Sequence, residues 1–307
     1  MIYQDVSTRD FSGAQRFMSE ENGNIKIIEC PRDAMQGIHQ FIPTEIKAAY
    51  INHLLDVGFD TIDFGSFVSE KAIPQMRDTA AVLPLLKISS STKLLSIVAN
   101  FKGAEIACQL DEISFLGYPF SISEQFQLNN TNSTRENSLK TIQQIQSLVL
   151  QSKKKLVVYI SMAFGNPYGE EWNSDIAAFW ITKIAGMGIE IMALSDTVGV
   201  AEAEDVSSIF GTMSKEFPAI EFGVHLHCRP DNWRNKTEAA YRSGCRRFDA
   251  AINGYGGCPM ANDSLVGNLA TENLIQFLDE KNCVTGIDRI RFNKAVDYAA
   301  TVFNGAL

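Results

Sequence analysis

The chain has 307 residues, of which 45% are hydrophobic and 21% are charged. This composition is typical of a folded globular protein and excludes disordered, collagen-like and coiled-coil chains. Thirty-six acidic residues against 27 basic ones give a net charge of −9, which disfavours lasting contact with the phosphate backbone of nucleic acids. No stretch without charges is long enough to span a bilayer as a helix, so we expect neither a nucleic-acid partner nor a membrane partner.

The first 24 residues are polar and mix both signs of charge without an apolar core. They fit neither a secretory nor a mitochondrial presequence, so we expect a cytoplasmic protein with an N-terminal arm at residues 1–24. The six cysteines stand far apart and form no CxxC pair, which argues against a disulfide framework or a zinc knuckle. Any cysteine that matters for function is therefore expected to act alone.

Short apolar or β-branched runs alternate with longer amphipathic segments along the rest of the chain, which is the pattern of βαβ units with a parallel sheet. The expected strands are 25–30, 61–64, 93–99, 112–116, 156–162, 189–194, 220–225 and 246–252. The expected helices are 43–57, 73–86, 103–110, 133–151, 174–187, 203–217, 233–243 and 264–280, with an extra helix at 288–304.

Eight strands and eight helices in strict alternation, about 30 residues apart, predict an α/β protein with the (β/α)8 TIM-barrel fold. The fingerprint GxGxxG of dinucleotide-binding folds is absent after the first strand. We predict a TIM-barrel catalytic domain at residues 25–280, preceded by the N-terminal arm and followed by a C-terminal helical extension at 281–307. One large core then serves the whole chain.

Two histidines follow the seventh expected strand, at a position where a barrel carries its chemistry. His225 and His227 are two residues apart, so both imidazoles project to the same side of the strand and can reach one ion. A carboxylate from Asp33 and an amide oxygen from Asn268 complete a nitrogen and oxygen set that suits Mg²⁺, Mn²⁺ or Zn²⁺. We predict a divalent-metal site with these four ligands, in which Mg²⁺ or Mn²⁺ is favoured.

Further polar residues follow the other strands and are candidates for catalysis or substrate binding. Arg32 offers a fixed guanidinium fork that can hold a carboxylate or stabilise a developing enolate. Cys258 ends a glycine-rich segment, from which its thiol can act as an acid or base once the segment closes over a substrate. The remaining candidates after the strands are Gln36, Asp63, Asn166, Asp196 and Thr197.

Seven motifs in this order resemble the 3-hydroxy-3-methylglutaryl-CoA lyase family, within the metal-dependent barrel lyases and synthases. The likeness spans residues 25–277, and the SFVS and GGCP pieces favour the lyase branch. The motifs are PRDAMQ at 31–36, SFVSEKAIPQM at 66–76, SMAFGNPYG at 161–169, SDTVGV at 195–200, HLH at 225–227, GYGGCP at 254–259 and GNLATENL at 267–274.

The resemblance implies cleavage of a 3-hydroxyacyl-CoA into acetyl-CoA and a keto acid, acetoacetate in the family's standard case. It implies that Arg32 stabilises the enolate, that Cys258 takes part in proton transfer and that either Asp33 or His225 is the general base. It also implies that three acidic residues orient ligands or substrate, namely Asp63, Asp196 and Glu272. The expected partner is therefore an acyl-CoA.

Some residues at the expected barrel mouth depart from the family pattern. These departures suggest that the substrate carries a different acyl group from the family's standard substrate. The family's Asn-Glu-Lys becomes Gly37-Ile38-His39, and its strand-2 glutamate becomes Asp63. Two other functions stay open: an aldolase or Claisen condensing enzyme acting on a 2-oxo acid, and a non-catalytic metal-binding barrel. The sequence does not mark the oligomeric state; a homodimer also stays open, because barrels of this kind often pair through the extra C-terminal helix.

Overall fold

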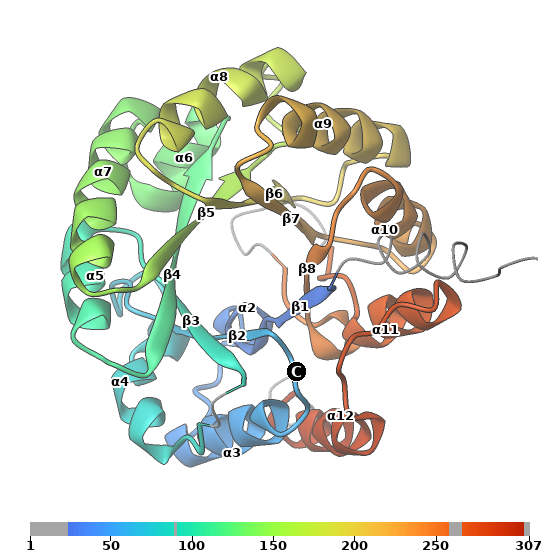
Figure 1. Cartoon of the computed structure of the whole chain (residues 1–307). Coiled ribbons are helices and arrows are strands. Elements are labelled where there is room, and N and C mark those ends of the chain that lie inside the picture. Colours follow the sequence, from blue (N-terminus) through green and yellow to red (C-terminus); the bar gives the residue numbers. More distant parts are fainter. Residues whose placement is uncertain (1–23, 89–90, 258–265, 304–307) are drawn as a thin grey trace, which may run out of the picture.

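The computed structural model describes residues 24–88, 91–257 and 266–303 and forms a closed barrel of eight parallel strands in sequence order. Helices surround the barrel, as Figure 1 shows in a view along its axis. The strands are β1 (Lys26–Glu29), β2 (Thr61–Ser66), β3 (Lys93–Ile97), β4 (Ile113–Ser121), β5 (Lys155–Ser161), β6 (Ile191–Asp196), β7 (Glu221–Leu226) and β8 (Arg247–Ala250). The predicted (β/α)8 fold is confirmed.

The α-helices are α2 (Pro31–Gln36), α3 (Thr44–Leu55), α4 (Thr79–Val82), α5 (Phe101–Cys108), α6 (Glu124–Thr131), α7 (Arg135–Gln151), α8 (Ser174–Ala185), α9 (Ala203–Glu216), α10 (Trp233–Arg242), α11 (Thr271–Glu280) and α12 (Arg289–Phe303). The extra C-terminal helix is α12, which packs beside α3 (Figure 1). The N-terminal arm up to residue 23 lies outside the described residues, and the division of the chain into three parts stays a prediction.

Two helices were not expected from the sequence. The first, α2, begins directly after β1, with Cys30 as its N-terminal flanking residue and Pro31 in the first turn, where a proline costs no hydrogen bond. The second, α6, follows β4, which is longer than the expected strand at 112–116. Because α2 is only six residues long, its amphipathic period is too short to be read from the sequence.

The expected helix at 73–86 is interrupted. It contains a 3₁₀ turn at Pro74–Met76, the short α4, and a second 3₁₀ turn at Leu83–Leu85. Pro74 and Pro84 explain the interruption, since a proline inside a helix removes a hydrogen bond and clashes with the preceding turn. The segment is therefore shaped as a sequence of turns beside the barrel mouth.

The barrel interior is filled by large and small side chains. Its apolar layer consists of Leu95, Ile97, Val157, Tyr159, Ile191 and Ala193. Gly117 on β4 faces this layer, and a β-carbon there would approach Ile97 Cδ1 to 2.5 Å and the Tyr159 ring to 3.0 Å. The missing side chain makes room for the Tyr159 ring.

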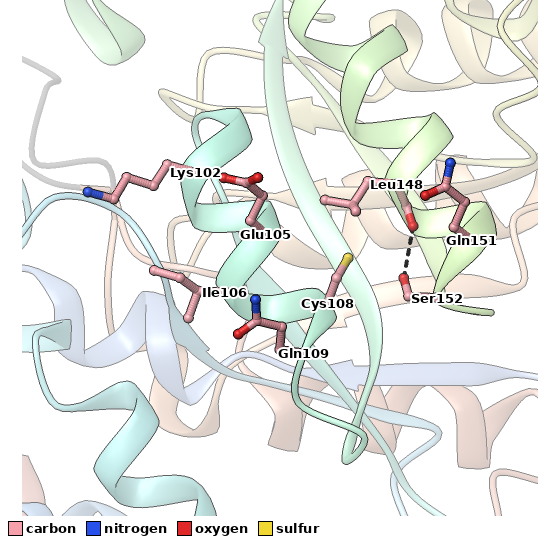
Figure 2. Close-up of a pocket in the computed structure, with 8 residues that line it drawn as sticks. All are labelled: Lys102, Glu105, Ile106, Cys108, Gln109, Leu148, Gln151 and Ser152. Carbon is pink, nitrogen blue, oxygen red and sulfur yellow. Dashed lines mark hydrogen bonds between the residues drawn. The ribbon is translucent and has the colours of Figure 1, made fainter.

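Outside the barrel, a hollow of about 520 Å³ lies between α5 and α7 (Figure 2). Its lining includes Lys102 and Cys108 from α5 and Leu148 from α7. None of its lining residues belongs to the predicted site. Within the part of the chain that the structure describes, no helix is both long and apolar enough to cross a membrane.

Candidate functional site

Helix α2 places three polar side chains at the carboxyl end of β1. Arg32 Nη1 donates to Asp33 Oδ1 at 3.0 Å and to Gln36 Oε1 at 2.9 Å. Gln36 Nε2 donates to the same Asp33 oxygen at 2.7 Å. The three predicted residues therefore form one hydrogen-bonded unit, in which the guanidinium and the carboxylate are buried and Gln36 is half-buried.

Asp63 on β2 completes this unit from the neighbouring strand. Its Oδ2 accepts hydrogen bonds from Arg32 Nε at 3.0 Å and from Arg32 Nη2 at 2.6 Å. The other oxygen, Oδ1, is buried and has no partner within the described residues. Burial raises the pKa of Asp63 to about 6, although Arg32 opposes the shift. Asp63 thus holds the Arg32 guanidinium through Oδ2, and its Oδ1 can still accept a hydrogen bond.

Strand β7 brings the two histidines to the same place. One ligand atom each from Asp33, His225 and His227 lies within 4.8 Å of the others, and the two imidazole centroids are 5.2 Å apart. Asn268 forms a β-bridge with His227, and its Nδ2 donates to Asp33 Oδ2 at 2.7 Å and to the Tyr255 carbonyl at 2.8 Å. The structure therefore brings Asp33, His225 and His227 together, with Asn268 beside them, hydrogen-bonded to Asp33 through its amide nitrogen.

The chemistry of these residues fits a divalent cation. His227 Nε2 is buried without a hydrogen-bond partner among the described residues, which is costly unless a ligand fills the position. Burial, then the neighbouring His225, lowers the pKa of His227 to about 4, so its imidazole is neutral near pH 7. Burial opposes ionisation of Asp33, but Arg32 and both histidines outweigh it and lower its pKa. A neutral imidazole beside a carboxylate is the donor set that a metal requires.

Asp249 on β8 is a site residue that the sequence analysis missed. The register of the two strands places it opposite His225, and its Oδ2 lies 3.3 Å from His225 Nδ1. The side chain is fully buried, and its Oδ1 has no partner in the described part of the chain. A carboxylate beside Nδ1 favours the tautomer that is protonated there and leaves Nε2 available to a cation, which is the usual support of a metal-binding histidine.

A second group of donors shares His225. Ligand atoms of Cys30, His225 and Asp249 also lie within 4.8 Å of one another. Burial and the surrounding carboxylates raise the pKa of the Cys30 thiol well above its usual value, and its sulfur lies 3.5 Å from the Ile28 carbonyl oxygen. Metals bind the thiolate, so this group is the poorer cation site.

Asp196 and Thr197 lie at the end of β6, where their polar atoms are used within the chain. Asp196 Oδ2 accepts from Lys236 Nζ at 2.7 Å, and its Oδ1 accepts from the backbone nitrogens of Val200 and Ala201 at 3.0 and 3.2 Å. Thr197 Oγ1 accepts from the Met162 nitrogen at 3.0 Å. Lys236 also donates to the His227 carbonyl at 3.1 Å, so this buried ion pair holds the end of β7.

Asn166 lies in the loop after β5, and Glu272 lies in the first turn of α11. Asn166 Oδ1 accepts from the nitrogens of Tyr168 and Glu170, which closes a turn after β5. Glu272 accepts from the Asn253 nitrogen at 2.9 and 3.2 Å and so ties α11 to the start of the glycine-rich segment. Cys258, the predicted proton-transfer residue, lies outside the described residues.

Comparisons with known proteins agree with one another. A family model described as HMGL-like matches residues 24–298. The cytoplasmic 3-hydroxy-3-methylglutaryl-CoA lyase of Danio rerio is 30% identical over 311 residues, covering 96% of this chain and 90% of that protein. The mitochondrial hydroxymethylglutaryl-CoA lyase of Mus musculus is 29% identical over 283 residues, covering 91% of this chain and 86% of the relative.

Solved structures give the same picture. The HMG-CoA lyase from Brucella melitensis superposes with a TM-score of 0.86 at 26% identity, covering 92% of this chain and 99% of that one. The HMG-CoA lyase from Acinetobacter baumannii, solved in complex with coenzyme A and 3-methylmalate, gives a TM-score of 0.85 at 28% identity and covers 92% of each chain.

Proposed function

The chain belongs to the HMGL-like family, and from this premise we propose that it is a carbon–carbon lyase that cleaves 3-hydroxy-3-methylglutaryl-CoA, or a close 3-hydroxyacyl-CoA. The products are acetyl-CoA and a keto acid, acetoacetate for the standard substrate. The observation that carries the proposal is the buried cluster of Arg32, Asp33, His225 and His227 at the carboxyl ends of the strands. This is the end of the barrel where TIM-barrel enzymes carry their active sites.

We assign the divalent cation to Asp33, His225, His227 and Asn268. These oxygen and nitrogen donors favour Mg²⁺ or Mn²⁺, with Zn²⁺ as the alternative. When bound, such a cation polarises the substrate's 3-hydroxyl group and makes its proton easier to remove. Two observations support this assignment. His227 Nε2 has no partner within the described part of the chain, and Asp249 lies beside Nδ1 of His225.

The residues then divide the work of cleavage. Asp33 or His225 accepts the proton of the 3-hydroxyl, the bond between C2 and C3 breaks, and C3 becomes the ketone of the keto acid. The electron pair remains on C2 as a thioester enolate, whose negative oxygen Arg32 stabilises. Protonation of C2 completes acetyl-CoA, and we assign that proton transfer to Cys258.

The other predicted residues act around this core. Gln36 and Asp63 hold Arg32 in place, because both are hydrogen-bonded to its guanidinium. Asn166, Thr197 and Glu272 shape the loops at the mouth, where their oxygens accept backbone hydrogen bonds. Asp196 does the same at the end of β6.

Product analysis tests this function. Protein treated with chelator and then resupplied with Mg²⁺ or Mn²⁺ is incubated with 3-hydroxy-3-methylglutaryl-CoA, and the products are identified by mass spectrometry. We expect acetyl-CoA and acetoacetate in equal amounts, and no cleavage before the metal returns. Condensation of acetyl-CoA with a 2-oxo acid would instead identify a synthase or aldolase. No turnover of any acyl-CoA despite stoichiometric metal would identify a non-catalytic barrel.

Two expectations about the protein's setting stay predictions. The matched relatives include lyases named as cytoplasmic and as mitochondrial, and we propose the cytoplasmic location of the former for this chain. A homodimer formed through α12 is likewise a prediction, because barrels of this kind often pair through the extra C-terminal helix.

A further inference from the structure

A cavity of about 230 Å³ lies beside the cluster and is not used by the mechanism above. Residues 36–39 and 41, which follow α2, form one wall, and residues 72–75 and 77, around the 3₁₀ turn at Pro74–Met76, form the other. Gln36 belongs both to this cavity and to the catalytic cluster, through its bonds to Arg32 and Asp33. We call this space the Arg77 cavity.

The two walls of the Arg77 cavity are fastened to each other. Gln75 is buried; its Oε1 accepts from the Ile42 nitrogen at 2.9 Å, and its Nε2 donates to the carbonyls of Ile38 and Gln40 at 3.0 and 2.9 Å. Behind the wall, Lys47 Nζ donates to the Gln75 carbonyl and to Asp78 Oδ1. The cavity is thus preformed, as ligand pockets usually are.

Arg77 gives the cavity its charge. Its guanidinium carbon lies 3.7 Å from the centroid of the Phe41 ring, which presents the planar fork on an aromatic support. Lys47 Nζ lies 4.2 Å from the centroid of the same ring, but its charge is neutralised by its ion pair with Asp78. No carboxylate among the described residues lies within 4.0 Å of the Arg77 guanidinium, so an exposed cation stands unpaired in a chain of net charge −9.

The rest of the lining is mixed. Ile38, Ile73 and Pro74 offer apolar surface, and His39 adds an exposed polar ring. Such a lining suits a chain of carbon atoms that carries an anionic oxygen group, which the Arg77 fork can hold with two hydrogen bonds. An acyl-CoA has this chemistry at both ends, in the phosphates of CoA and in a carboxylate on the acyl group.

We propose that the Arg77 cavity is a subsite for the acyl-CoA, in which Arg77 binds an anionic oxygen group of the ligand that reacts at Arg32 and Asp33. This inference rests on the proposed function and extends it to how the substrate is held. It gives a role to the AIPQ stretch of the SFVSEKAIPQM motif and to the changed residues after Gln36.

The test compares Arg77→Ala and Arg77→Lys with Lys102→Ala, a matched loss of one surface cation in the hollow of Figure 2. Affinities of the metal-loaded protein for CoA, 3′-dephospho-CoA and pantetheine are measured by calorimetry. KM and kcat are measured for 3-hydroxy-3-methylglutaryl-CoA and for 3-hydroxy-3-methylbutyryl-CoA, which lacks the acyl carboxylate. We expect Arg77→Ala to weaken the affinity for the ligands that carry the recognised anionic group about tenfold, as expected when a solvent-exposed charge-assisted contact is lost, with kcat nearly unchanged.

The pattern of losses identifies the anionic group. A loss with CoA but not with pantetheine assigns Arg77 to a phosphate. A loss with 3-hydroxy-3-methylglutaryl-CoA but not with its analogue lacking the carboxylate assigns it to the acyl end. In either case the affinities of Lys102→Ala should match those of the wild type. The loss of affinity in Arg77→Ala should become smaller as the salt concentration is raised.

Unchanged affinities in Arg77→Ala, or equal losses for ligands with and without the anionic group, would overturn the proposal. The failures of site and function are separable. If cleavage proceeds equally well in Arg77→Ala, the subsite proposal is wrong and the lyase assignment stands. Arg77-dependent binding of CoA without cleavage keeps the subsite and removes the lyase.

Discussion

Two buried ion pairs, Arg32–Asp63 and Lys236–Asp196, differ in how completely their polar atoms are hydrogen-bonded. Lys236 donates to Asp196, to the Gly199 carbonyl and to the His227 carbonyl, which uses all three of its protons. Both oxygens of Asp196 are also satisfied.

The Arg32–Asp63 pair differs because Asp63 Oδ1 is buried and has no hydrogen-bond partner among the described residues. His227 Nε2 is a second such atom in the same cluster. Buried polar atoms without partners are rare in folded proteins because each one costs free energy. We propose that the Lys236–Asp196 pair stabilises the fold, whereas the Arg32–Asp63 pair and the predicted metal ligands serve to bind a ligand. The predictions below test this contrast.

The largest effect is expected for Lys236→Met, which leaves the Asp196 carboxylate buried without its cation. Breaking such a pair costs about 3–5 kcal/mol, so the free energy of unfolding measured in urea should fall by that amount. The double variant Lys236→Met, Asp196→Asn should lose less, because no uncompensated charge remains. A stable Lys236→Met protein with a raised KM would show instead that Asp196 binds substrate.

Arg32→Met should lower kcat by at least about two orders of magnitude, the usual loss for one electrostatic stabiliser of a transition state. Asp63 is expected to take up a proton in this variant, since burial already raises its pKa to about 6. Arg32→Lys serves as the matched control and should recover little activity, because a point charge cannot replace the fork. Wild-type kcat in Arg32→Met would place this pair with Lys236–Asp196 as structural.

Asp249→Asn should weaken the affinity for Mn²⁺ about 10- to 100-fold, the range found for residues that support metal ligands. The asparagine keeps the volume but no longer supplies the carboxylate that holds His225 Nδ1 at 3.3 Å. Titration calorimetry, or the electron paramagnetic resonance signal of free Mn²⁺, gives the affinity without relying on turnover. An unchanged affinity would mean that β7 alone orients the imidazole.

The last prediction concerns pH and Asp63, and its effect per pH unit is the smallest. Its pKa is about 6 in the folded protein against 3.8 for the ordinary group, so the folded state binds more protons between these values. The free energy of unfolding should therefore fall as pH rises from 4 to 6, by at most about 1.4 kcal/mol per pH unit, and then level off. Asp63→Asn should remove this contribution. Identical pH dependence of unfolding in both proteins would contradict it.

The sequence predicted the barrel well because eight strand patterns recur at regular spacing. The two-residue spacing of His225 and His227 on a strand was enough to place both imidazoles on one side, and Asp33 and Asn268 do lie beside them. Asp249 could not be found in this way, because its contact with His225 depends on the register between β7 and β8.

Other features depend on tertiary contacts that no local pattern reveals. Asp196 is bonded to Lys236, 40 positions away in the sequence, and no local pattern predicts that contact. Helix α2 was not predicted because the residues of its motif were interpreted as catalytic. The segment at 73–86 was predicted to be one helix, although Pro74 and Pro84 divide it into turns. The Arg77 cavity lies between these two misjudged segments.

The most direct test of the account is an anomalous-scattering map of crystals grown with Mn²⁺ and CoA. We predict one peak within coordination distance of Asp33, His225 Nε2, His227 Nε2 and Asn268 Oδ1, with His225 Nδ1 still facing Asp249. A peak among Cys30, His225 and Asp249 instead, or a crystal saturated with Mn²⁺ that shows no peak in the cluster, would contradict it.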